Sequence, residues 1–537
     1  MKKQEVDCLI IGAGPVGLTL ACQLRQYGVS CRVLDKVESP VIRTKAAGIW
    51  SRTVEFLDQM GLAEKFLDEG LRCYGASIFA DGKRIAHLHL EGIDSFYNFI
   101  LLIPQHETER ILREHLQQLG ADVEYGQALS SLRQDSDKVV AVLESGEEIE
   151  AQWLVGCDGA HSRVRHSLGL EFVGQKLDTQ WIVSDLKVRG LPLGEEVQVY
   201  LHEEGPTAFF PLGNYFYRLV AETEPLMDAS NEGRARFEVE RLIKARLPHD
   251  LTIEEVSRAG YFSIHERQVQ KYQVGRVFLA GDAAHVHSPL GGQGMNTGIH
   301  DVNNLSWKIA MVTLHGSSPT LLETYHEERF PVGEWIVKAT SRGMTVATSR
   351  QPIVAALRKQ AAKLFANLPP VQSRIRNTLA ETEIHYRDSS LSKEPSRFAS
   401  GWKFGKGIKA GERALDANVG ENGKRLSKYL TGCRFHLLLF VSEEDSAHPV
   451  IERLATAVHQ EFSEFVQVLI IGTELDAPTT AHAKYLADIT GELHHQYAAT
   501  EPSAYLLRPD TYVAYRSQPI DQEGVLSYLK ALGMGVG

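Results

Sequence analysis

The chain of 537 residues is too long for a single hydrophobic core, and its length predicts about three or four domains. Its composition, 43% hydrophobic and 23% charged, is typical of a globular protein that buries a large core. The net charge of -11 argues against nucleic acid or an acidic membrane surface as a partner, because both select basic surfaces.

The six cysteines form no CxxC pair and no metal-ligand spacing, and most of them lie in apolar runs. They indicate reduced core residues in a reducing, cytoplasmic compartment. Near the N-terminus, Glu5, Asp7 and the break at Gly12 argue against a secretory signal. No apolar run reaches the roughly 18 residues of a spanning helix, so we expect no membrane partner.

The first predicted element is the apolar run from Val6 to Ile11, which has the pattern of a strand buried on both faces of a parallel sheet. A helix and a second strand, Cys31–Leu34, follow it. Between the first strand and the helix lies GAGPVG, with Gly12, Gly14, Pro15 and Gly17. Such glycines admit a pyrophosphate at the helix N-terminus, and the acidic Asp35, about 20 residues on, can accept bonds from a ribose. The segment predicts a dinucleotide-binding βαβ unit.

Four further segments follow before the chain changes character. RTKAAGIWSR, residues 43–52, is a basic loop ahead of an amphipathic helix, and scattered charge of this kind is by itself typical of a solvated surface. An apolar segment ending at Gln105 precedes another helix. Alternation from Val123 to Glu150 predicts a β-meander. A buried strand then ends at Asp158-Gly159, and AHSRVRH follows.

Residues 176–273 consist of short predicted strands rich in aromatic side chains. This pattern predicts a mostly antiparallel sheet that forms a second domain. Aromatic residues in such sheets are more often core than pocket lining, so we assign none of them to a substrate. We expect the first domain to occupy residues 1–175 and to resume, with a helical region, over residues 274–399.

The chain returns to the first domain through the apolar segment Val277–Ala280, which ends at Gly281-Asp282. The loop HSPLGGQGMN follows and leads into a long helix with apolar residues at three-and-four spacing. Because the first N–H groups of a helix have no partner within it and lie at its positive end, this loop is predicted to bind an anion.

Each of three distant motifs, GAGPVG, Asp158-Gly159 and Gly281-Asp282, follows a buried strand. The ends of parallel strands meet at one crevice of an open sheet, so we expect the motifs to line one dinucleotide. There is no second GxGxxG between a strand and a helix. Any second nucleotide must therefore bind elsewhere and transiently.

Residues 400–537 form a third predicted part, in which a glycine-rich linker leads into alternating strands and helices. The size suits a small α/β domain. The loop SEEDSAHP after Val441 has no cysteine, so disulfide exchange is not expected there. We interpret this domain as a packing or dimer-related appendage.

Together, GAGPVG, GCDGAHSRVR and GDAAHVHSPLGGQGMNTG resemble the FAD-dependent aromatic hydroxylases, single-component flavoprotein monooxygenases related to p-hydroxybenzoate hydroxylase. The resemblance covers about residues 5 to 350. LLRPDTYVAYR, residues 506–516, is similar to the thioredoxin-like domain of the phenol, polyketide and antibiotic hydroxylase branch. The resemblance implies an α/β fold: a Rossmann-like FAD-binding domain, an inserted mostly antiparallel substrate sheet and a C-terminal thioredoxin-like α/β domain.

The resemblance also implies roles for the motif residues in binding FAD. The glycine loop would admit the FAD pyrophosphate, and Asp35, followed by Lys36, would bind the adenosine ribose. The family usually has Glu at this position, and the shorter Asp favours a bridging water. Gln105 matches the glutamine beside the flavin chain, and Asp282 matches the residue that bonds the ribitol.

Other matched residues would surround the reacting end of the flavin. Arg43 matches the arginine near the mobile flavin, and Asp158 with Arg163 and Arg165 matches a motif linked to both FAD and NAD(P)H. The last loop would place backbone N–H groups at the pyrimidine end, where reduced flavin carries negative charge. Its matched residues are Pro289, Gly291, Gly292, Gly294, Met295 and Asn296. We name Arg43, Pro289 and Gly291 as the catalytic environment.

The implied reaction uses O2 and transient NADPH or NADH to form a flavin hydroperoxide, which hydroxylates an aromatic small molecule. A free phenol has a pKa of about 10, and the sequence identifies no base to activate it. His285 and His287 alone make an incomplete metal site, so no metal is expected. A reductase or epoxidase of the same fold and a flavin-bound sensor or interaction protein stay open, as does homodimerisation.

Overall fold

The computed structural model describes residues 5–41, 46–191, 195–224, 232–247, 251–289, 291–348, 368–395, 404–420, 422–441, 449–474 and 482–533. The chain divides into two compact units. Unit 1 comprises Met1–Cys22, Ser30–Val302 and Phe330–Thr382, and unit 2 comprises Gln23–Val29, Asn303–Arg329 and Glu383–Gly537. Across the described ranges, no helix combines the length and apolar character needed to cross a membrane.

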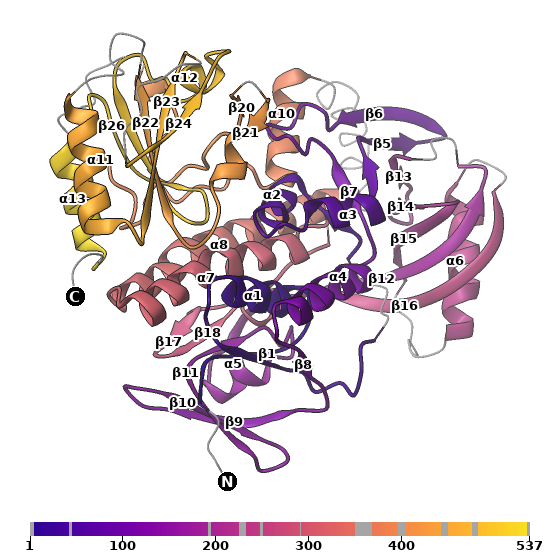
Figure 1. Ribbon diagram of the computed structural model, residues 1–537. Helices are drawn as coiled ribbons and strands as arrows, with labels where there is room; N and C mark the ends of the chain where they lie inside the picture. The colour runs from indigo at the N-terminus through magenta and orange to yellow at the C-terminus, as the bar shows by residue number, and fades with distance from the viewer. Residues whose placement is uncertain are drawn as a thin grey trace. The chain divides into compact units, whose positions relative to one another are not determined.

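The first sheet of unit 1 joins parallel strands from distant parts of the chain (Figure 1). Its parallel strands, in spatial order, are β18 (Val277–Leu279), β11 (Glu148–Gly156), β1 (Glu5–Ile11), β2 (Cys31–Leu34) and β8 (Val123–Glu124). Antiparallel strands extend it: β9 (Leu129–Gln134), β10 (Val139–Leu143) and β17 (Gln273–Val274). The apolar runs predicted as buried strands are buried, as parallel strands covered on both faces require.

Three helices follow the ends of strands: one follows β1, one follows β7 (Ile100–Leu102) and one follows β11. They are α1 (Pro15–Gln26), α4 (Gln105–Gln118) and α5 (Arg163–Ser167). Pro15 opens α1, where its missing N–H removes no helical bond. The start of α1 therefore follows directly from the glycine loop.

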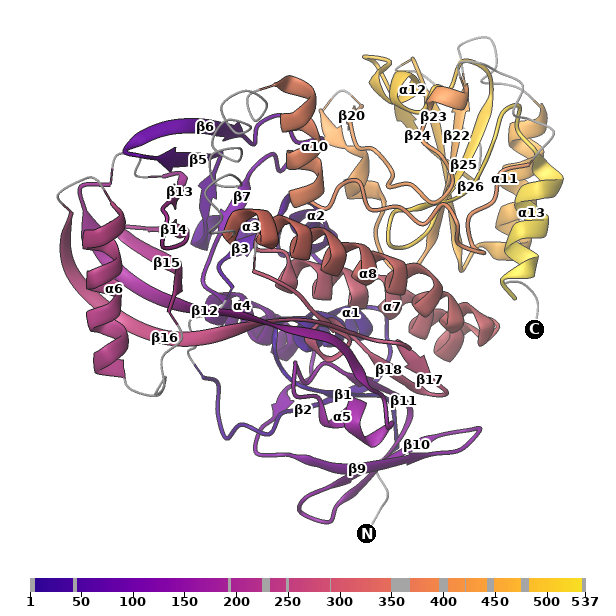
Figure 2. The ribbon, with the colours of Figure 1, turned by 180° about the vertical axis from the view of Figure 1, so that it is seen from behind.

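The second sheet of unit 1 is mostly antiparallel, as the aromatic pattern predicted. Its spatial order is β19 (His285–Val286), β16 (Thr252–Val269), β12 (Phe172–Arg189), β15 (Phe216–Thr223), β14 (Thr207–Gly213), β13 (Val197–Leu201), β5 (Gly75–Ala80) and β6 (Lys83–His89). Helix α6 (Glu232–Arg246) lies along one face and buries Val239 and Leu242 there (Figures 1 and 2). The pair β13 and β5 is parallel, so the sheet takes in a hairpin that lies far earlier in the sequence.

Unit 1 also contains a small three-stranded sheet, formed by residues between 48 and 102. It contains β3 (Gly48–Ile49), β7 (Ile100–Leu102) and β4 (Leu71–Cys73), with the helices α2 (Ser51–Gln59) and α3 (Ala63–Glu69). Trp50 packs in an apolar cluster with Val197 and Phe210 of the antiparallel sheet. This cluster joins the segment after the basic loop to the sheet.

After β18 the chain is largely helical. The elements are η1 (Gly281–Ala283), α7 (Gly294–His315), α8 (Thr320–Thr348) and α10 (Pro369–Leu379). In the sequence, Pro331 and Pro369-Pro370 predict kinks, because proline interrupts the hydrogen bonds of a helix. Pro331 lies inside α8, whereas Pro369 begins α10, the position where proline fits a helix best.

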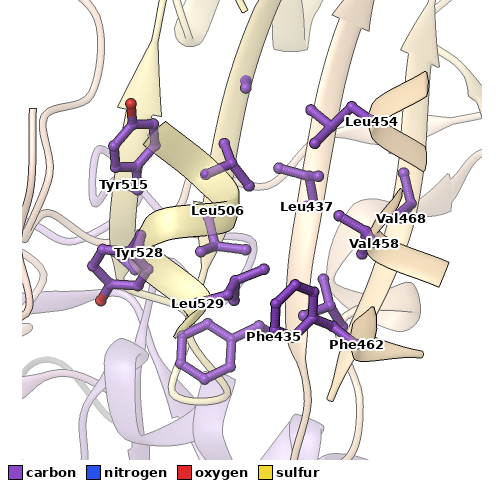
Figure 3. Packing of buried hydrophobic residues seen from close by; sticks show 14 of the residues in the cluster. Phe435, Leu437, Leu454, Val458, Phe462, Val468, Leu506, Tyr515, Tyr528 and Leu529 are labelled. Atoms are coloured by element: carbon purple, nitrogen blue, oxygen red, sulfur yellow. The ribbon is translucent and has the colours of Figure 1, made fainter. Parts of the chain in front are cut away.

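Unit 2 contains a mixed sheet in the order β24 (Lys484–Ala487), β23 (Val466–Gly472), β22 (Phe435–Val441), β25 (Ser503–Leu507) and β26 (Val513–Ser517). The helices are α11 (Pro449–Phe462), α12 (Glu492–Gln496) and α13 (Gln522–Ala531), and the short elements are η2 (Phe404–Lys406), β20 (Asn418–Val419), β21 (Lys424–Arg425) and η3 (Leu426–Tyr429). Figure 3 shows Val458 of α11 and Leu529 of α13 on the face of the sheet that carries Phe435 and Leu437 of β22. The predicted α/β class is confirmed, whereas the thioredoxin-like identity stays a prediction.

Unit 2 also contains a buried cluster of ionic side chains. Glu328 of α8 accepts hydrogen bonds from Lys308 Nζ at 2.8 Å and Arg508 Nη2 at 3.0 Å. Arg508 also pairs with Asp510, and its guanidinium lies 5.3 Å from the ring centre of Trp307. We call these residues, Lys308, Glu328, Arg508 and Asp510, the buried ion cluster. Removing one member would leave an uncompensated charge in the core.

Candidate functional site

The structure brings the three predicted motifs to one edge of the parallel sheet. Ile11 pairs with Gly156, and Gly156 pairs with Leu279, both in parallel register. Cys157 N–H donates to Ile11 O at 2.8 Å, and Ala280 N–H donates to Gly156 O at 3.0 Å. The glycine loop, the Asp158 turn and the Gly281 turn therefore leave adjacent strands side by side.

Backbone contacts explain two glycines of the first loop, and the third is open. A Cβ at Gly17 would lie 1.9 Å from Gly12 O, and one at Gly12 would lie 2.4 Å from Cys157 O. Gly14 has nothing within 4 Å of its Cβ position. Among the described residues, the N–H groups of Val16 and Gly17 have no protein acceptor, because the first bond of α1 comes from Leu18. An open glycine beside free N–H groups fits a pyrophosphate.

Asp35 at the end of β2 is half-buried and bonds to the same loop. Its Oδ2 accepts from Ala13 N–H at 2.8 Å, and its Oδ1 accepts from Val37 N–H at 3.1 Å. Each carboxylate oxygen accepts more than one bond, so Asp35 keeps acceptor capacity for a ribose hydroxyl. The neighbouring Lys36 is exposed.

Asp158 caps the short helix α5. Its Oδ2 accepts from the N–H groups of Arg163 at 2.6 Å and Val164 at 3.1 Å. Burial raises the pKa of Asp158, and these hydrogen bonds partly offset the increase. Arg165 is buried and donates to Ala160 O and Ala283 O, so it joins the Asp158 turn to the Gly281 turn. Its guanidinium is therefore occupied by protein acceptors, and Arg163 is the exposed member of the pair.

Asp282 is exposed, and no hydrogen bond joins its side chain to another described residue. The turn that carries it depends instead on Asp301 of α7. Asp301 Oδ2 accepts from Gly281 N–H at 3.0 Å and lies 2.8 Å from His285 Nε2, with both side chains buried. The sequence reasoning missed Asp301. Its one signal was an acidic residue between the apolar positions Ile299 and Val302 of the predicted helix.

The loop before α7 is tied to the segment that follows the basic loop. Asn296 Nδ2 donates to Gly48 O at 3.0 Å and to Gly292 O at 2.9 Å, and its Oδ1 accepts from Trp50 N–H at 2.9 Å. Trp50 Nε1 donates to Gly291 O at 2.7 Å. The predicted site residue Asn296 thus fixes the loop with its side chain, and no sequence pattern indicated Trp50 as its partner.

The start of α7 presents free backbone donors. Gly292 N–H bonds back to Pro289 O at 3.0 Å, and the next N–H to bond back is that of Thr297, to Gln293 O at 2.8 Å. Among the described residues, Met295 and Asn296 N–H therefore have no protein acceptor. Gly294 precedes them as the first residue of the helix, and Pro289 is exposed. Arg43 and Leu290, which belong to the predicted environment, lie outside the described residues.

Gln105 bonds to protein through both ends of its amide. Its Oε1 accepts from Ala46 N–H at 3.4 Å, and its Nε2 donates to Glu109 at 2.8 Å. The side chain therefore fixes the backbone at Ala46, directly after the basic loop. Its predicted place beside the flavin chain stays a prediction.

The two histidines of the Gly281 motif lie with their rings nearly parallel, 6.3 Å apart. His287 Nδ1 lies 2.9 Å from Ser288 O, and burial lowers the pKa of His287. His287 is therefore neutral at physiological pH. Within the described ranges, no three His, Cys, Asp or Glu side chains group in a way that could hold a metal ion.

A group of basic side chains lies beside the Asp158 turn. Burial lowers the pKa of His265, and Arg267, Lys176 and His161 lower it further by like-charge repulsion. Arg267 also repels Arg165, and its Nε is buried without a hydrogen-bond partner among the described residues. We call His161, Lys176, His265 and Arg267 the basic group. It is suited to bind an anion.

Comparison with known proteins extends over both units. A family model described as FAD binding domain matches residues 5–340. Rifampicin monooxygenase of Streptomyces venezuelae is 35% identical over 362 residues, 67% of this chain and 75% of that protein. 6-Methylpretetramide 4-monooxygenase of Streptomyces rimosus is 29% identical over 534 residues, 98% of this chain and 93% of that protein. The solved structure of an anhydrotetracycline hydroxylase from Streptomyces rimosus has a TM-score of 0.78 and 28% identity, and covers 99% of this chain and 100% of that one.

Proposed function

The chain belongs to the FAD binding domain family and is an FAD-dependent monooxygenase, and from this we propose that it hydroxylates a phenolic or polyketide-like aromatic ring with NAD(P)H and O2. The observation that carries the proposal is the convergence of three strand ends around Gly14 and Asp282. Gly14 has open space at its Cβ position, and the exposed Asp282 carboxylate has no hydrogen bond to another described residue. No other dinucleotide-binding turn is evident in the described sequence.

The residues present fit FAD along its whole length. Free N–H groups at the start of α1 would bind the pyrophosphate, Asp35 the adenosine ribose and Asp282 the ribitol. The free N–H groups of Met295 and Asn296 would stabilise negative charge at the pyrimidine end of the flavin. When bound, FAD would supply the redox chemistry, namely hydride acceptance from NAD(P)H and activation of O2. The protein supplies position, charge and exclusion of water.

We propose that the basic group binds the phosphates of NAD(P)H. It adjoins the Asp158 turn, and within the described residues no carboxylate forms an ion pair with Lys176 or Arg267. Cations without acidic partners attract a phosphorylated ligand over a distance of about 8–10 Å at physiological ionic strength. A transient nucleotide needs such attraction more than a deep pocket.

The substrate class follows from the relatives and from the apolar cluster around Trp50. The two relatives are named for rifampicin and 6-methylpretetramide. The cluster that joins Trp50 to Val197 and Phe210 is a buried set of hydrophobic side chains, and Trp50 also bonds to the loop before α7. An apolar environment there favours a neutral ring over a charged one.

A substrate screen tests the proposal directly. The FAD-loaded protein is mixed with NADH or NADPH and a panel of simple phenols and polycyclic aromatic polyketides, and oxidation of the nicotinamide is followed with product mass. The expected result is stimulated oxidation and a product heavier by one oxygen. Stimulated oxidation without that product would indicate a reductase. The absence of oxidation with every compound would remove the enzymatic proposal.

A further inference from the structure

A buried histidine of α7 has a polar side chain beside each of its two ring nitrogens. His300 is 3% exposed. Its Nε2 lies 3.0 Å from Thr53 Oγ1 of α2, and its Nδ1 lies 2.9 Å from Glu381 Oε2. Glu381 is also buried, and its other carboxylate oxygen accepts from Thr297 Oγ1 at 2.9 Å. We call these side chains, Thr53, Thr297, His300 and Glu381, the His300 network, and all of them belong to unit 1.

The backbone at Glu381 has an uncommon conformation. Glu381 lies just after the end of α10 with a φ of 57°, in the left-handed region. Helices often end with a residue in this conformation, but that residue is usually glycine, because a side chain is crowded there. A glutamate at this position is therefore strained, and its carboxylate contacts both Thr297 and His300 of α7.

The His300 network can hold its histidine in two protonation states. In the neutral state, Nδ1–H faces the Glu381 carboxylate, and the Thr53 hydroxyl donates to the lone pair of Nε2. When Nε2 also binds a proton, the same hydroxyl rotates and accepts Nε2–H, because a hydroxyl is both a donor and an acceptor. The gain of a proton therefore leaves neither ring nitrogen without a partner, and it creates a charge pair with Glu381.

The two other histidines near the loop before α7 lack this arrangement. His285 Nε2 lies against Asp301, but His285 Nδ1 is buried without a hydrogen-bond partner among the described residues. His287 Nδ1 donates to a backbone carbonyl, and its Nε2 is likewise buried without a partner in the described part of the chain. His287 also lies close enough to Glu381 for the carboxylate to act on its charge. A further proton on either ring would bury an N–H without an acceptor, so His300 is the one of the three that is suited to gain a proton.

The other charged groups around His300 are already compensated. Phe56 of α2 meets the His300 ring edge to face, with the ring centres 4.9 Å apart. The Arg52 guanidinium lies 4.3 Å from the ring centre of Phe56 and is paired with Glu55. Asp301, the next residue of α7, is bound to the Gly281 turn. Glu381 is therefore the carboxylate that faces the His300 ring directly.

We infer that His300 takes up one proton when the bound flavin is reduced. The inference rests on the proposed placement of the pyrimidine end of FAD at the N–H groups of Met295 and Asn296. His300 follows Asn296 by four residues and lies one turn away on the same face of α7. A hydride from NAD(P)H brings two electrons and one proton and leaves the flavin with one negative charge. A proton from solvent then binds to His300 Nε2 and compensates that charge, because a nearby negative charge favours the imidazolium.

The pH dependence of the flavin reduction potential tests the inference. For a two-electron couple a tenfold change in the equilibrium constant is about 30 mV, so the potential falls by about 30 mV per pH unit for one proton and by about 59 mV for two. We expect the slope of the unaltered FAD-loaded protein to approach the larger value between about pH 6 and 9, where histidine titrates. We expect His300→Gln to keep the smaller value across this range. The potential is set electrochemically, so the measurement needs neither NAD(P)H nor an aromatic substrate.

Substitutions at Thr53 separate protonation from packing. Thr53→Val removes the acceptor for the second proton and should give the smaller slope, whereas Thr53→Ser keeps the hydroxyl and should retain the larger one. His115→Gln is the control, because His115 is a half-buried histidine of α4 outside the His300 network, and its slope should equal that of the unaltered protein. If His300→Gln does not fold or does not retain FAD, the two Thr53 variants decide the question.

A slope of about 30 mV per pH unit in the unaltered protein would overturn the inference. An unchanged slope in His300→Gln, or equal slopes in Thr53→Val and Thr53→Ser, would overturn it as well. Failure of the proposed function is a separate result: no compound in the substrate screen stimulates oxidation, while the difference in slope between the unaltered protein and His300→Gln persists.

Discussion

Asp282 and Asp301 both lie at the Gly281 turn, but one is exposed and the other is buried. Asp282 is exposed and its carboxylate has no bond to another described side chain or backbone group. Asp301 is fully buried and bonds to Gly281 N–H and His285. A substitution at Asp282 therefore removes a group offered to a ligand, whereas one at Asp301 removes a group on which the protein itself depends.

We expect Asp282→Ala to abolish tight FAD binding without unfolding the apoprotein. Exposed side chains away from specific contacts change stability by only about 0.5 kcal/mol, so the thermal midpoint of the apoprotein should stay the same. The FAD-to-protein ratio after gel filtration measures the loss. Asp301→Asn is the matched comparison and should lower apoprotein stability by about 1–3 kcal/mol. A fully yellow Asp282→Ala protein would contradict the ribitol assignment.

Two arginines are expected to act on reduction and not on FAD retention. Arg267→Ala should raise the KM for NAD(P)H by weakening phosphate binding, and the effect should shrink as salt is added, because salt screens the attraction between the basic group and the phosphates. Arg43→Ala, chosen from the family resemblance, should slow flavin reduction with FAD still bound. Anaerobic stopped-flow reduction measures both. Unchanged reduction kinetics in either variant would remove that residue from the mechanism.

At the scale of elements, the glycines of the loop Gly12–Gly17 have two different roles, one in packing and one in ligand binding. Gly17 lies where α1 crosses the loop, and any Cβ there would collide with Gly12 O. Gly14 lies in the same loop with open space beside it. One glycine is required by the packing of a helix on a strand, and the other by what approaches from outside.

We therefore expect Gly17→Ala to reduce the stability of the apoprotein and Gly14→Ala to reduce its affinity for FAD. Gly17→Ala should destabilise the apoprotein, because the loop and α1 must move apart. Gly14→Ala should leave apoprotein stability unchanged and weaken FAD binding, because the new methyl occupies the space of the pyrophosphate. Urea unfolding of the apoprotein and FAD titration measure the two quantities. A Gly14→Ala protein with unaltered FAD affinity would place the pyrophosphate elsewhere.

The sequence predicted the parts of the site that are encoded locally. Each strand, turn and helix start near Gly12, Asp158 and Asp282 is specified by a short stretch of residues, and parallel sheet geometry then brings them together. Periodicity also separated the antiparallel sheet from the parallel one. No local pattern could show that β5 pairs in parallel with β13, because that pairing depends on the packing of distant segments.

The contacts that fix the site were not predictable either, because they join residues that are far apart in the sequence. Trp50 contacts Gly291 across 241 positions, and Arg218 contacts Ala46 across 172. In the sequence, Trp50 belonged to a charged loop and Arg218 to an aromatic strand. A buried arginine has the same sequence appearance as an exposed one, and only the fold shows which carbonyl it meets.

At the scale of the whole molecule, the buried ion cluster determines how unit 2 responds to acid. Burial alone would raise the pKa of Glu328, but Arg508 and Lys308 outweigh it and hold the pKa well below the usual 4.5. Burial lowers the pKa of Lys308 to about 8, which still leaves it charged for the most part at neutral pH. The folded pKa of Glu328 is depressed, so its stabilising effect is present above pH 4.5 and is lost as the pH falls below that value.

We expect Glu328→Gln to destabilise unit 2 at pH 7 by about 3–5 kcal/mol, because Lys308 and Arg508 lose their shared carboxylate. Between pH 6 and pH 3 the stability of the variant should fall less than that of the unaltered protein, so the two curves converge in acid. Thermal unfolding across this pH range measures the effect. Glu461→Gln removes an exposed partner of Lys530 and should leave the pH dependence unchanged. Parallel curves for Glu328→Gln would contradict the assignment.

The buried ion cluster also sets a condition on synthesis of the chain. Glu328 leaves the ribosome 180 residues before Arg508. At about 5–20 residues per second this interval lasts roughly 9–36 s. Throughout that time Lys308 and Glu328 lack Arg508, and until Phe435 is made the apolar face of Trp307 and Met311 has no sheet to cover it. A nascent or truncated chain that ends before Arg508 therefore exposes a surface that chaperones bind and proteases attack, and this selects for complete chains.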